Sequence, residues 1–151
     1  MQNYLDLTGK VALVTGASSG IGAATSILLA DLGARVAIVY HRNQEAAEQL
    51  QFSITRTGGR AIFIRADVTQ ADEIRALVSH TIQEFGPIDI LVNNAGSLLY
   101  RQRILELTER TWDEVMNLNL RSVMICSQAV ASSMIERKTG AILVFPRFCR
   151  G

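Results

Sequence analysis

Residues 11–22 constrain the fold more than any other stretch, because an apolar run there leads directly into a glycine-rich turn. Glycines stand at positions 16, 20 and 22, and apolar side chains then recur at the spacing of one helix face: Ile21, Ala24, Leu28 and Leu32. The pattern predicts a strand, a tight turn and a helix. Free N–H groups at a helix N-terminus attract anions, and glycine lets an anion come close to the main chain. We therefore expect a phosphate- or dinucleotide-binding loop, the alternative being an ordinary glycine-rich turn.

The rest of the chain alternates strands with helices. Strands are predicted at 10–15, 36–40, 61–65, 88–92 and 141–145, and helices at 20–32, 43–56, from a capping box at Thr69 and Asp72 to Phe85, from a Thr108 cap through Val115, and at about 119–137. The third helix carries its apolar residues at helical spacing: Ile74, Leu77, Val78, Ile82 and Phe85. This alternation is typical of a parallel α/β sheet with right-handed crossovers. Ligands of such sheets bind beyond the carboxyl ends of the strands.

Composition indicates one folded domain spanning residues 1–151, with 48% apolar and 19% charged residues. Fifteen basic and fourteen acidic side chains give a net charge of +1 with no basic stripe, which argues against a nucleic-acid partner. The chain shows no leader and no apolar run near the ~18 residues of a membrane span, so we expect a cytoplasmic protein without a membrane partner. Cys126 and Cys149 have no disulfide or metal-ligand spacing, so no metal is expected and Cys126 is predicted in the core.

The second predicted strand ends on Tyr40, which is followed by His41 and Arg42. Many dinucleotide folds carry an acid at this place for the ribose 2′-OH, whereas an arginine there accommodates a 2′-phosphate. The absence of an acid before Glu45 favours NADP(H) over NAD(H). The alternative is that His41 and Arg42 are simply a solvated loop pair.

Four motifs resemble those of the short-chain dehydrogenase/reductase family: Thr15-Gly16-x-x-x-Gly20-x-Gly22, Asp67-Val68, Asn93-Asn94-Ala95-Gly96, and the run from Trp112 to Leu120. The resemblance covers residues 7 to about 145 and is nearest the branch of glucose dehydrogenases and 3-oxoacyl-carrier-protein reductases. It implies a Rossmann-like doubly wound sheet in the order 3-2-1-4-5 and an NAD(P)(H)-dependent oxidoreductase acting on an alcohol or ketone. It also implies a homo-oligomer, with the helix at 119–137 at a subunit interface.

The resemblance assigns roles to individual positions. Asp67-Val68 lies against the adenine, Asn93 braces the sheet, the Ala95-Gly96 backbone follows the cofactor, and Asn119 is catalytic. The full set of expected cofactor-binding residues is Gly16, Ser18, Ser19, Gly20, Ile21, Gly22, Tyr40, His41, Arg42, Asp67, Val68, Asn93, Ala95 and Gly96.

The family pattern breaks after the fifth strand. Two serines are expected there, the second of them catalytic, but the positions read Pro146 and Arg147. The family's Tyr-x-x-x-Lys is also absent, because the only lysines are Lys10 and Lys138 and neither has a tyrosine four residues before it. We therefore expect a fragment, from truncation or a frameshift, that keeps only cofactor-binding elements. The alternatives are a non-catalytic nucleotide-binding or regulatory module and a product without function.

The missing C-terminal part has a structural consequence in this interpretation. The strand at 141–145 would be an exposed apolar edge, and Val123, Met124 and Val130 would be less covered than in the family.

Overall fold

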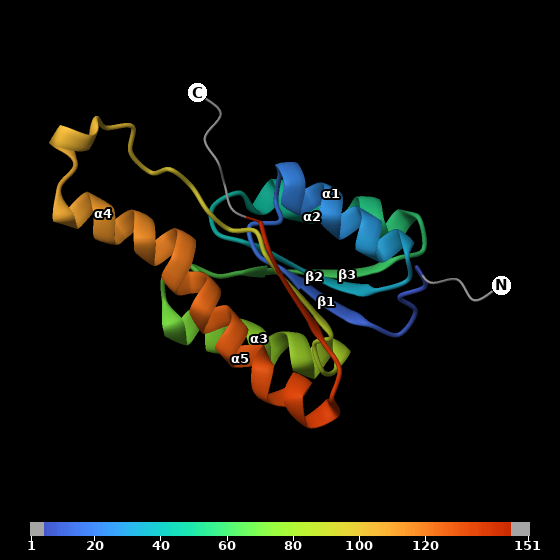
Figure 1. The fold of residues 1–151 in the computed structure, drawn as a ribbon. Coiled ribbons are helices and arrows are strands. Elements are labelled where there is room, and N and C mark those ends of the chain that lie inside the picture. The colour runs from blue at the N-terminus through green and yellow to red at the C-terminus, as the bar shows by residue number, and fades with distance from the viewer. Residues whose placement is uncertain (1–4, 146–151) are drawn as a thin grey trace.

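The computed structural model describes residues 5–145, and these form one parallel five-stranded sheet with helices on both faces (Figure 1). The strands are β1 (Val11–Val14), β2 (Arg35–Tyr40), β3 (Arg60–Arg65), β4 (Ile90–Asn93) and β5 (Ala141–Val144). Their order is β3-β2-β1-β4-β5. This confirms the predicted fold class and strand order. Pro146, Arg147 and Cys149, which the sequence analysis singled out, lie outside the described residues.

Four helices cover the sheet in two layers (Figure 1). They are α1 (Gly20–Asp31) and α2 (Gln44–Arg56) on one face, and α3 (Ala71–Phe85) and α5 (Ser122–Arg137) on the other. β1 and β2 are buried almost throughout, as an unbroken apolar run in a parallel sheet requires. Alternate residues of each strand face the two layers, so the core has two halves. Cys126 is buried in the core as predicted, and it lies in the half that contains α3 and α5 residues.

Helix α1 forms where predicted, but the predicted buried face is wrong. Ile21 and Leu28 are mostly exposed, and the buried residues are Gly22, Ser26 and Ala30. These three small residues are four positions apart, so they too share one face of the helix. Small side chains let α1 approach the sheet closely, and this contact overrode the apolar pattern.

The start of α3 also differs from the prediction. Its N-cap is Gln70 and no side chain caps it, so the proposed box of Thr69 and Asp72 does not form. The Thr69 hydroxyl instead donates to Asp67 Oδ1 over 2.7 Å. Further along, Thr81 is fully buried where Ile82 was expected, because its hydroxyl donates to the Leu77 carbonyl at 2.9 Å and so needs no water.

A mainly helical segment between β4 and α5 extends beyond the end of the sheet (Figure 1). It comprises a 3₁₀ turn at Ile104–Glu106, helix α4 (Glu109–Met116) and a π-helical turn at Asn117–Arg121 that runs into α5. Thr108 caps α4 as predicted, in a capping box closed by Thr111. The π-helical turn was not predicted. Such turns are rare, and no periodicity argument distinguishes one from ordinary helix.

β5 is an edge strand and pairs only with β4 among the described residues. All four of its residues are exposed, as the sequence analysis expected. Met124 is exposed too, but Val130 is only 3% exposed, because α5 turns it towards the core beside α3. The expectation of poor cover was therefore wrong for Val130.

Candidate functional site

A cavity of about 260 Å³ lies at the carboxyl ends of β1, β2, β3 and β4. Ten of the predicted cofactor-binding residues line it: Gly16, Ser18, Ser19, Tyr40, His41, Arg42, Asp67, Val68, Ala95 and Gly96. Val39, Asn43, Ala66 and Leu118 complete the lining. Parallel topology explains why these distant segments meet, since every strand delivers its following loop to the same edge of the sheet.

The glycine loop is open towards the outside. Gly20 has a φ of +57°, a conformation that L side chains rarely adopt, and a Cβ added there would meet no atom within 4 Å. Ser19, the N-cap of α1, makes no side-chain capping bond. The first N–H groups of α1, at Gly20 and Ile21, have no partner within the described part of the chain and carry the positive end of the helix dipole. The loop therefore fits a phosphate group.

The loop is held from beneath by Asn94. Its amide nitrogen donates to the carbonyls of Thr15 at 3.0 Å and Gly16 at 2.9 Å. A Cβ on Gly22 would come within 2.4 Å of that same nitrogen, so only glycine allows α1 to start here. The Thr15 hydroxyl accepts from the N–H groups of Asn94 and Ala95, each at 3.0 Å. These bonds join the end of β4 to the glycine loop.

The predicted site residues include Asn93 but not its neighbour Asn94, whose side chain holds the glycine loop. The Asn93 side-chain amide donates one long hydrogen bond, 3.4 Å to the Ser127 hydroxyl on α5, and the main-chain carbonyl of Asn93 accepts from the Phe145 N–H at 2.9 Å. Asn93 thus joins β4 to α5 and to the end of β5.

The end of β2 presents both apolar and charged groups to the cavity. Tyr40 is 5% exposed and its ring lies 6.0 Å from that of Phe63. His41 and Arg42 are exposed at the cavity mouth. Asn43 then caps α2 by accepting from the Ala46 N–H at 3.0 Å. No carboxylate occupies positions 41–44, which directly follow Tyr40.

Asp67 stands across the cavity after β3. Its Oδ1 accepts two bonds from Thr69, from the backbone N–H at 2.9 Å and the hydroxyl at 2.7 Å. Its Oδ2 lies 3.7 Å from His41 Nε2. Burial opposes ionisation of Asp67, but the Thr69 hydrogen bonds and the charges of His41 and Arg42 hold its pKa below the usual value. Asp67 is therefore a fixed negative charge in this wall.

Asn119 lies in the π-helical turn and faces a second cavity. Its Oδ1 accepts from the Ser97 N–H at 3.1 Å, while its amide donates to the Ser97 carbonyl at 2.8 Å and to the Val115 carbonyl at 2.9 Å. This cavity of about 340 Å³ is lined by Asn93, Ala95, Ser97, Leu98, Val115, Asn119, Leu120, Val123, Val144 and Phe145. Ala95 borders both cavities, so the structure places Asn119 beside the first cavity and not in its wall.

Three predicted residues line neither cavity. Gly20 and Ile21 begin α1 and are exposed, whereas Gly22 follows them in the first turn of the helix and is buried. Gly20 and Ile21 contribute backbone N–H groups to the loop and not side chains.

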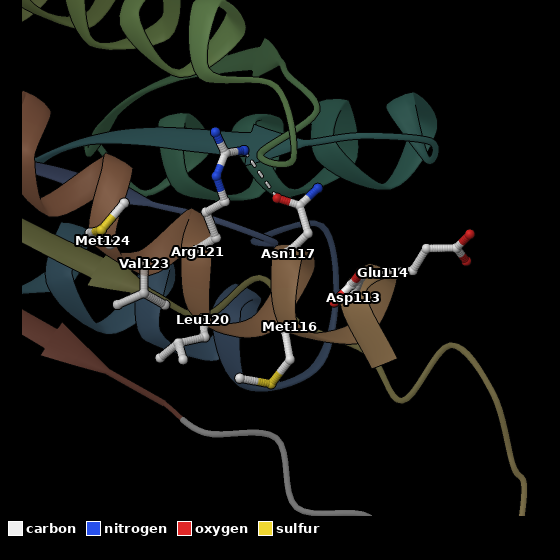
Figure 2. A pocket seen from close by; sticks show the side chains of 8 residues that line it. All are labelled: Asp113, Glu114, Met116, Asn117, Leu120, Arg121, Val123 and Met124. Carbon is white, nitrogen blue, oxygen red and sulfur yellow. Dashed lines mark hydrogen bonds between the residues drawn. The ribbon is translucent and has the colours of Figure 1, made fainter. Parts of the chain in front are cut away.

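A larger groove of about 900 Å³ lies on the outer side of α4, the π-helical turn and α5 (Figure 2). Asp113, Glu114, Met116, Asn117, Leu120, Arg121, Val123 and Met124 line it. Figure 2 shows the Arg121 guanidinium hydrogen-bonded to the side-chain oxygen of Asn117. The groove shares no lining residue with the cavity beside the glycine loop. We therefore place the candidate site at the two smaller cavities, where backbone donors and polar side chains converge.

Within residues 5–145, no group of three or more His, Cys, Asp or Glu side chains is placed to hold a metal ion. None of the helices in that range is long and apolar enough to cross a membrane.

Known proteins match this chain over most of its length. The model of the short chain dehydrogenase family matches residues 10–145. A 3-oxoacyl-[acyl-carrier-protein] reductase of Synechocystis is 42% identical over 91% of this chain and 55% of its own length. A 7α-hydroxysteroid dehydrogenase complexed with NADH and 7-oxo glycochenodeoxycholic acid superposes with a TM-score of 0.87 at 35% identity, over 93% of this chain and 54% of the other.

A short chain dehydrogenase of Burkholderia cenocepacia in complex with NADP gives a TM-score of 0.82 at 40% identity, over 91% of this chain and 55% of that one. The chain spans about half the length of the curated relatives it matches. The matched residues include the whole glycine loop, the Asn-Asn-Ala-Gly turn and Asn119. The chain therefore belongs to the short-chain dehydrogenase family.

Proposed function

We propose that residues 1–151 form one dinucleotide-binding domain that holds a nicotinamide cofactor for an oxidoreductase acting on an alcohol or ketone. The observation that carries this proposal is the uncapped start of α1, which opens beside a cavity at the carboxyl ends of four strands. The printed ligands of two structural relatives, NADH and NADP, support the cofactor class. Such a cofactor, when bound, supplies or accepts a hydride.

Three parts of the site would bind the diphosphate, the adenosine and the nicotinamide of the proposed cofactor. The N–H groups at Gly20 and Ile21 would hold the diphosphate, and the walls at Tyr40 and Asp67 would hold the adenosine. The nicotinamide would follow the backbone of Ala95 and Gly96 towards the second cavity. That cavity is mainly apolar, so it suits a small alcohol or ketone, with Asn119 in its wall.

Cofactor binding can be tested with a variant that should not weaken the fold. Ser19→Asp puts a carboxylate at the N-cap of α1, where aspartate is favoured, but directly where the diphosphate would lie. We expect NADPH and NADH fluorescence titrations to show binding to the wild-type chain and at least a tenfold loss in Ser19→Asp. Thr108→Asp, the same change at the N-cap of α4, is the matched control and should bind normally. Equal affinity in Ser19→Asp and wild type would contradict a diphosphate at this loop.

We propose that NADP(H) is preferred over NAD(H). Tyr40 brings no carboxylate to repel a 2′-phosphate, and Arg42 stands at the cavity mouth where it can pair with one. Arg42→Ala should weaken NADPH binding about five- to thirtyfold and leave NADH unchanged. Arg56→Ala, an exposed arginine at the other end of α2, is the control. Equal NADPH and NADH affinities in the wild-type chain would mean that His41 and Arg42 are only a solvated pair.

A non-catalytic nucleotide-binding or regulatory module is the second candidate, because residues 1–151 contain no Tyr-x-x-x-Lys. An ordinary tyrosine, with a pKa near 10, is a poor base at neutral pH without a neighbouring cation, and each acid–base group supplies roughly 10² to 10⁴ in rate. We expect the 151-residue chain to bind cofactor without turnover on simple alcohols and ketones. A rate that disappears in Asn119→Ala would overturn that expectation.

We also propose that the groove on α4 and α5 contacts a second copy of the chain. Met116, Leu120 and Met124 give it an apolar floor, and Leu120 and Met124 are at least half exposed. Asp113, Glu114 and Arg121 at its rim carry both signs of charge, as a self-complementary surface requires. Leu120→Lys should shift size-exclusion elution towards the monomer. An unchanged elution volume would contradict this contact.

A further inference from the structure

His41 and Asp67 face each other across the mouth of the proposed adenosine site. His41 Nε2 lies 3.7 Å from Asp67 Oδ2, and the side chains are 44% and 26% exposed. Both bonds from Thr69 go to Oδ1, so Oδ2 is left facing the imidazole. The Asp67 N–H donates to Glu73 Oε2 at 2.7 Å, which fixes the backbone as well. Asp67 is therefore a positioned partner for a protonated His41.

The other charged groups around His41 come from four places. Arg42 follows it on the same loop and acts electrostatically on Asp67. Glu45 in the first turn of α2 accepts a hydrogen bond from Gln49 and is held along that helix. Arg65 ends β3 in register with Tyr40, and Glu73 sits behind Asp67 at the start of α3. Within the described residues only Asp67 forms an ion pair with His41.

The state of His41 changes what the cavity mouth offers to an anion. A protonated His41 neutralises the Asp67 carboxylate and adds an N–H donor beside Arg42. A neutral His41 leaves the Asp67 carboxylate facing the same opening, where it repels a phosphate. Histidine side chains make this change between about pH 5 and 8.

We propose that His41 is a specificity-determining residue that favours the 2′-phosphate of NADP(H) only when its imidazole is protonated. This inference rests on the proposed cofactor function and extends it to the regulation of cofactor choice. The NADPH affinity should fall relative to the NADH affinity as pH rises from 6 to 8. NADH carries no 2′-phosphate, so its binding should not depend on His41.

Linkage gives a readout that does not require enzyme activity. A phosphate bound next to His41 favours the protonated imidazole, so NADPH binding near pH 7 should take up protons. The 2′-phosphate acts in the opposite direction, because a phosphate monoester with a pKa near 6 loses its proton when it meets a cation. The net contribution of His41, including its effect on the phosphate, is therefore the difference in proton uptake between the wild-type chain and a His41→Gln variant, in which Arg42 still lies at the cavity mouth.

The experiment is calorimetric titration at pH 7 in two buffers of different ionisation enthalpy. It compares the wild-type chain with His41→Gln and with His80→Gln, which removes the chain's only other histidine from an exposed position on α3. We expect wild type and His80→Gln to take up more protons with NADPH than His41→Gln does, and all three to behave alike with NADH. Between pH 6 and 8, the NADPH-to-NADH affinity ratio should fall roughly three- to tenfold more in wild type than in His41→Gln.

Two outcomes would overturn the proposal, and they differ. If NADPH binds and His41→Gln shows the same proton balance and the same pH dependence as wild type, the inference fails while the cofactor function stands. If none of the three proteins binds either cofactor, the proposed function fails and takes the inference with it.

Discussion

Arg137 at the end of α5 and Asp89 just before β4 form the most protected ion pair of the described residues. Arg137 donates to Asp89 Oδ1 and to the Ile88 carbonyl, each at 2.7 Å, and Asp89 Oδ2 accepts from the Val11 N–H at 3.0 Å. Arg137→Ala should lower the free energy of unfolding by about 2 kcal/mol, because it leaves a largely buried carboxylate short of a partner. Arg75→Ala, which breaks an exposed pair with Asp72, should cost about 0.5 kcal/mol or less. Urea unfolding of both variants would test this, and equal losses would contradict it.

The same pair predicts how stability depends on pH. Burial disfavours the charged form of Asp89, but the hydrogen bonds from Arg137 and Val11 and the charges of Lys10 and Arg137 hold its pKa below the ordinary 3.8. A lowered pKa stabilises the fold above the unfolded value, and this contribution is lost as pH falls below 3.8 towards the folded value. Arg137→Ala should therefore lose less stability than wild type between pH 5 and 3. The test is thermal denaturation of both proteins over that pH range. If their melting temperatures fall by the same amount from pH 5 to 3, the Asp89 carboxylate makes no such contribution to stability.

Residue identities in the site were predicted better than their partners. Glycine spacing and strand ends located ten residues of the first cavity, because parallel topology brings every strand end to one edge. The sequence could not show which of Asn93 and Asn94 turns towards the glycine loop. That choice depends on contacts made only in the folded chain, such as the close approach of the Asn94 amide to Gly22, where a Cβ would leave no room. The pairing of His41 with Asp67 was likewise invisible, since it joins two loops.

At the scale of elements, the sequence predicted where the helices and strands lie better than it predicted which face of a helix is buried. All five strands were predicted because each is a short apolar run bounded by polar or turn-forming residues. The buried face of α1 was misassigned because contact with the sheet selected the small residues Gly22, Ser26 and Ala30 over Ile21 and Leu28. The π-helical turn was not predicted because it is defined by its hydrogen-bond pattern, which the periodicity of apolar residues does not reveal.

The π-helical turn allows a prediction about the segment before α4. Asn119 holds both polar groups of the Ser97 backbone, so it anchors the start of the connection at residues 97–107. Asn119→Ala should raise the open population of this connection roughly five- to thirtyfold, the equivalent of one or two lost hydrogen bonds. Limited trypsin digestion after the exposed Arg101 and Arg103 would then be faster. Asn117→Ala, which loses only an exposed bond with Arg121, is the control. Equal cleavage rates in the two variants would contradict the anchor.

At the scale of the whole molecule, the two edges of the sheet differ in charge. β3 begins and ends on arginine, and edge charges discourage pairing with another chain. β5 has no charged residue, and Ile142, Leu143 and Val144 are each 40–49% exposed. By the parallel register, Leu143 shares a side with Val92 and hence with the α1 and α2 layer, but it remains 40% exposed there. β5 is therefore the edge at which strand pairing between copies is favoured.

We predict that the 151-residue chain self-associates at tens of micromolar through this edge, because within residues 5–145 one side of β5 has no partner strand and its surface is apolar and free of charge. Leu143→Lys should lower the scattering mass towards the 16.6 kDa monomer. Phe52→Lys is the matched control: it replaces a more exposed apolar side chain on α2 by the same charge, away from the edge. Static light scattering then separates two causes. If both variants dissolve the assemblies, added charge and not the edge is responsible; if Leu120→Lys alone does so, the helical groove is the contact. A monodisperse wild-type monomer would contradict association through either surface.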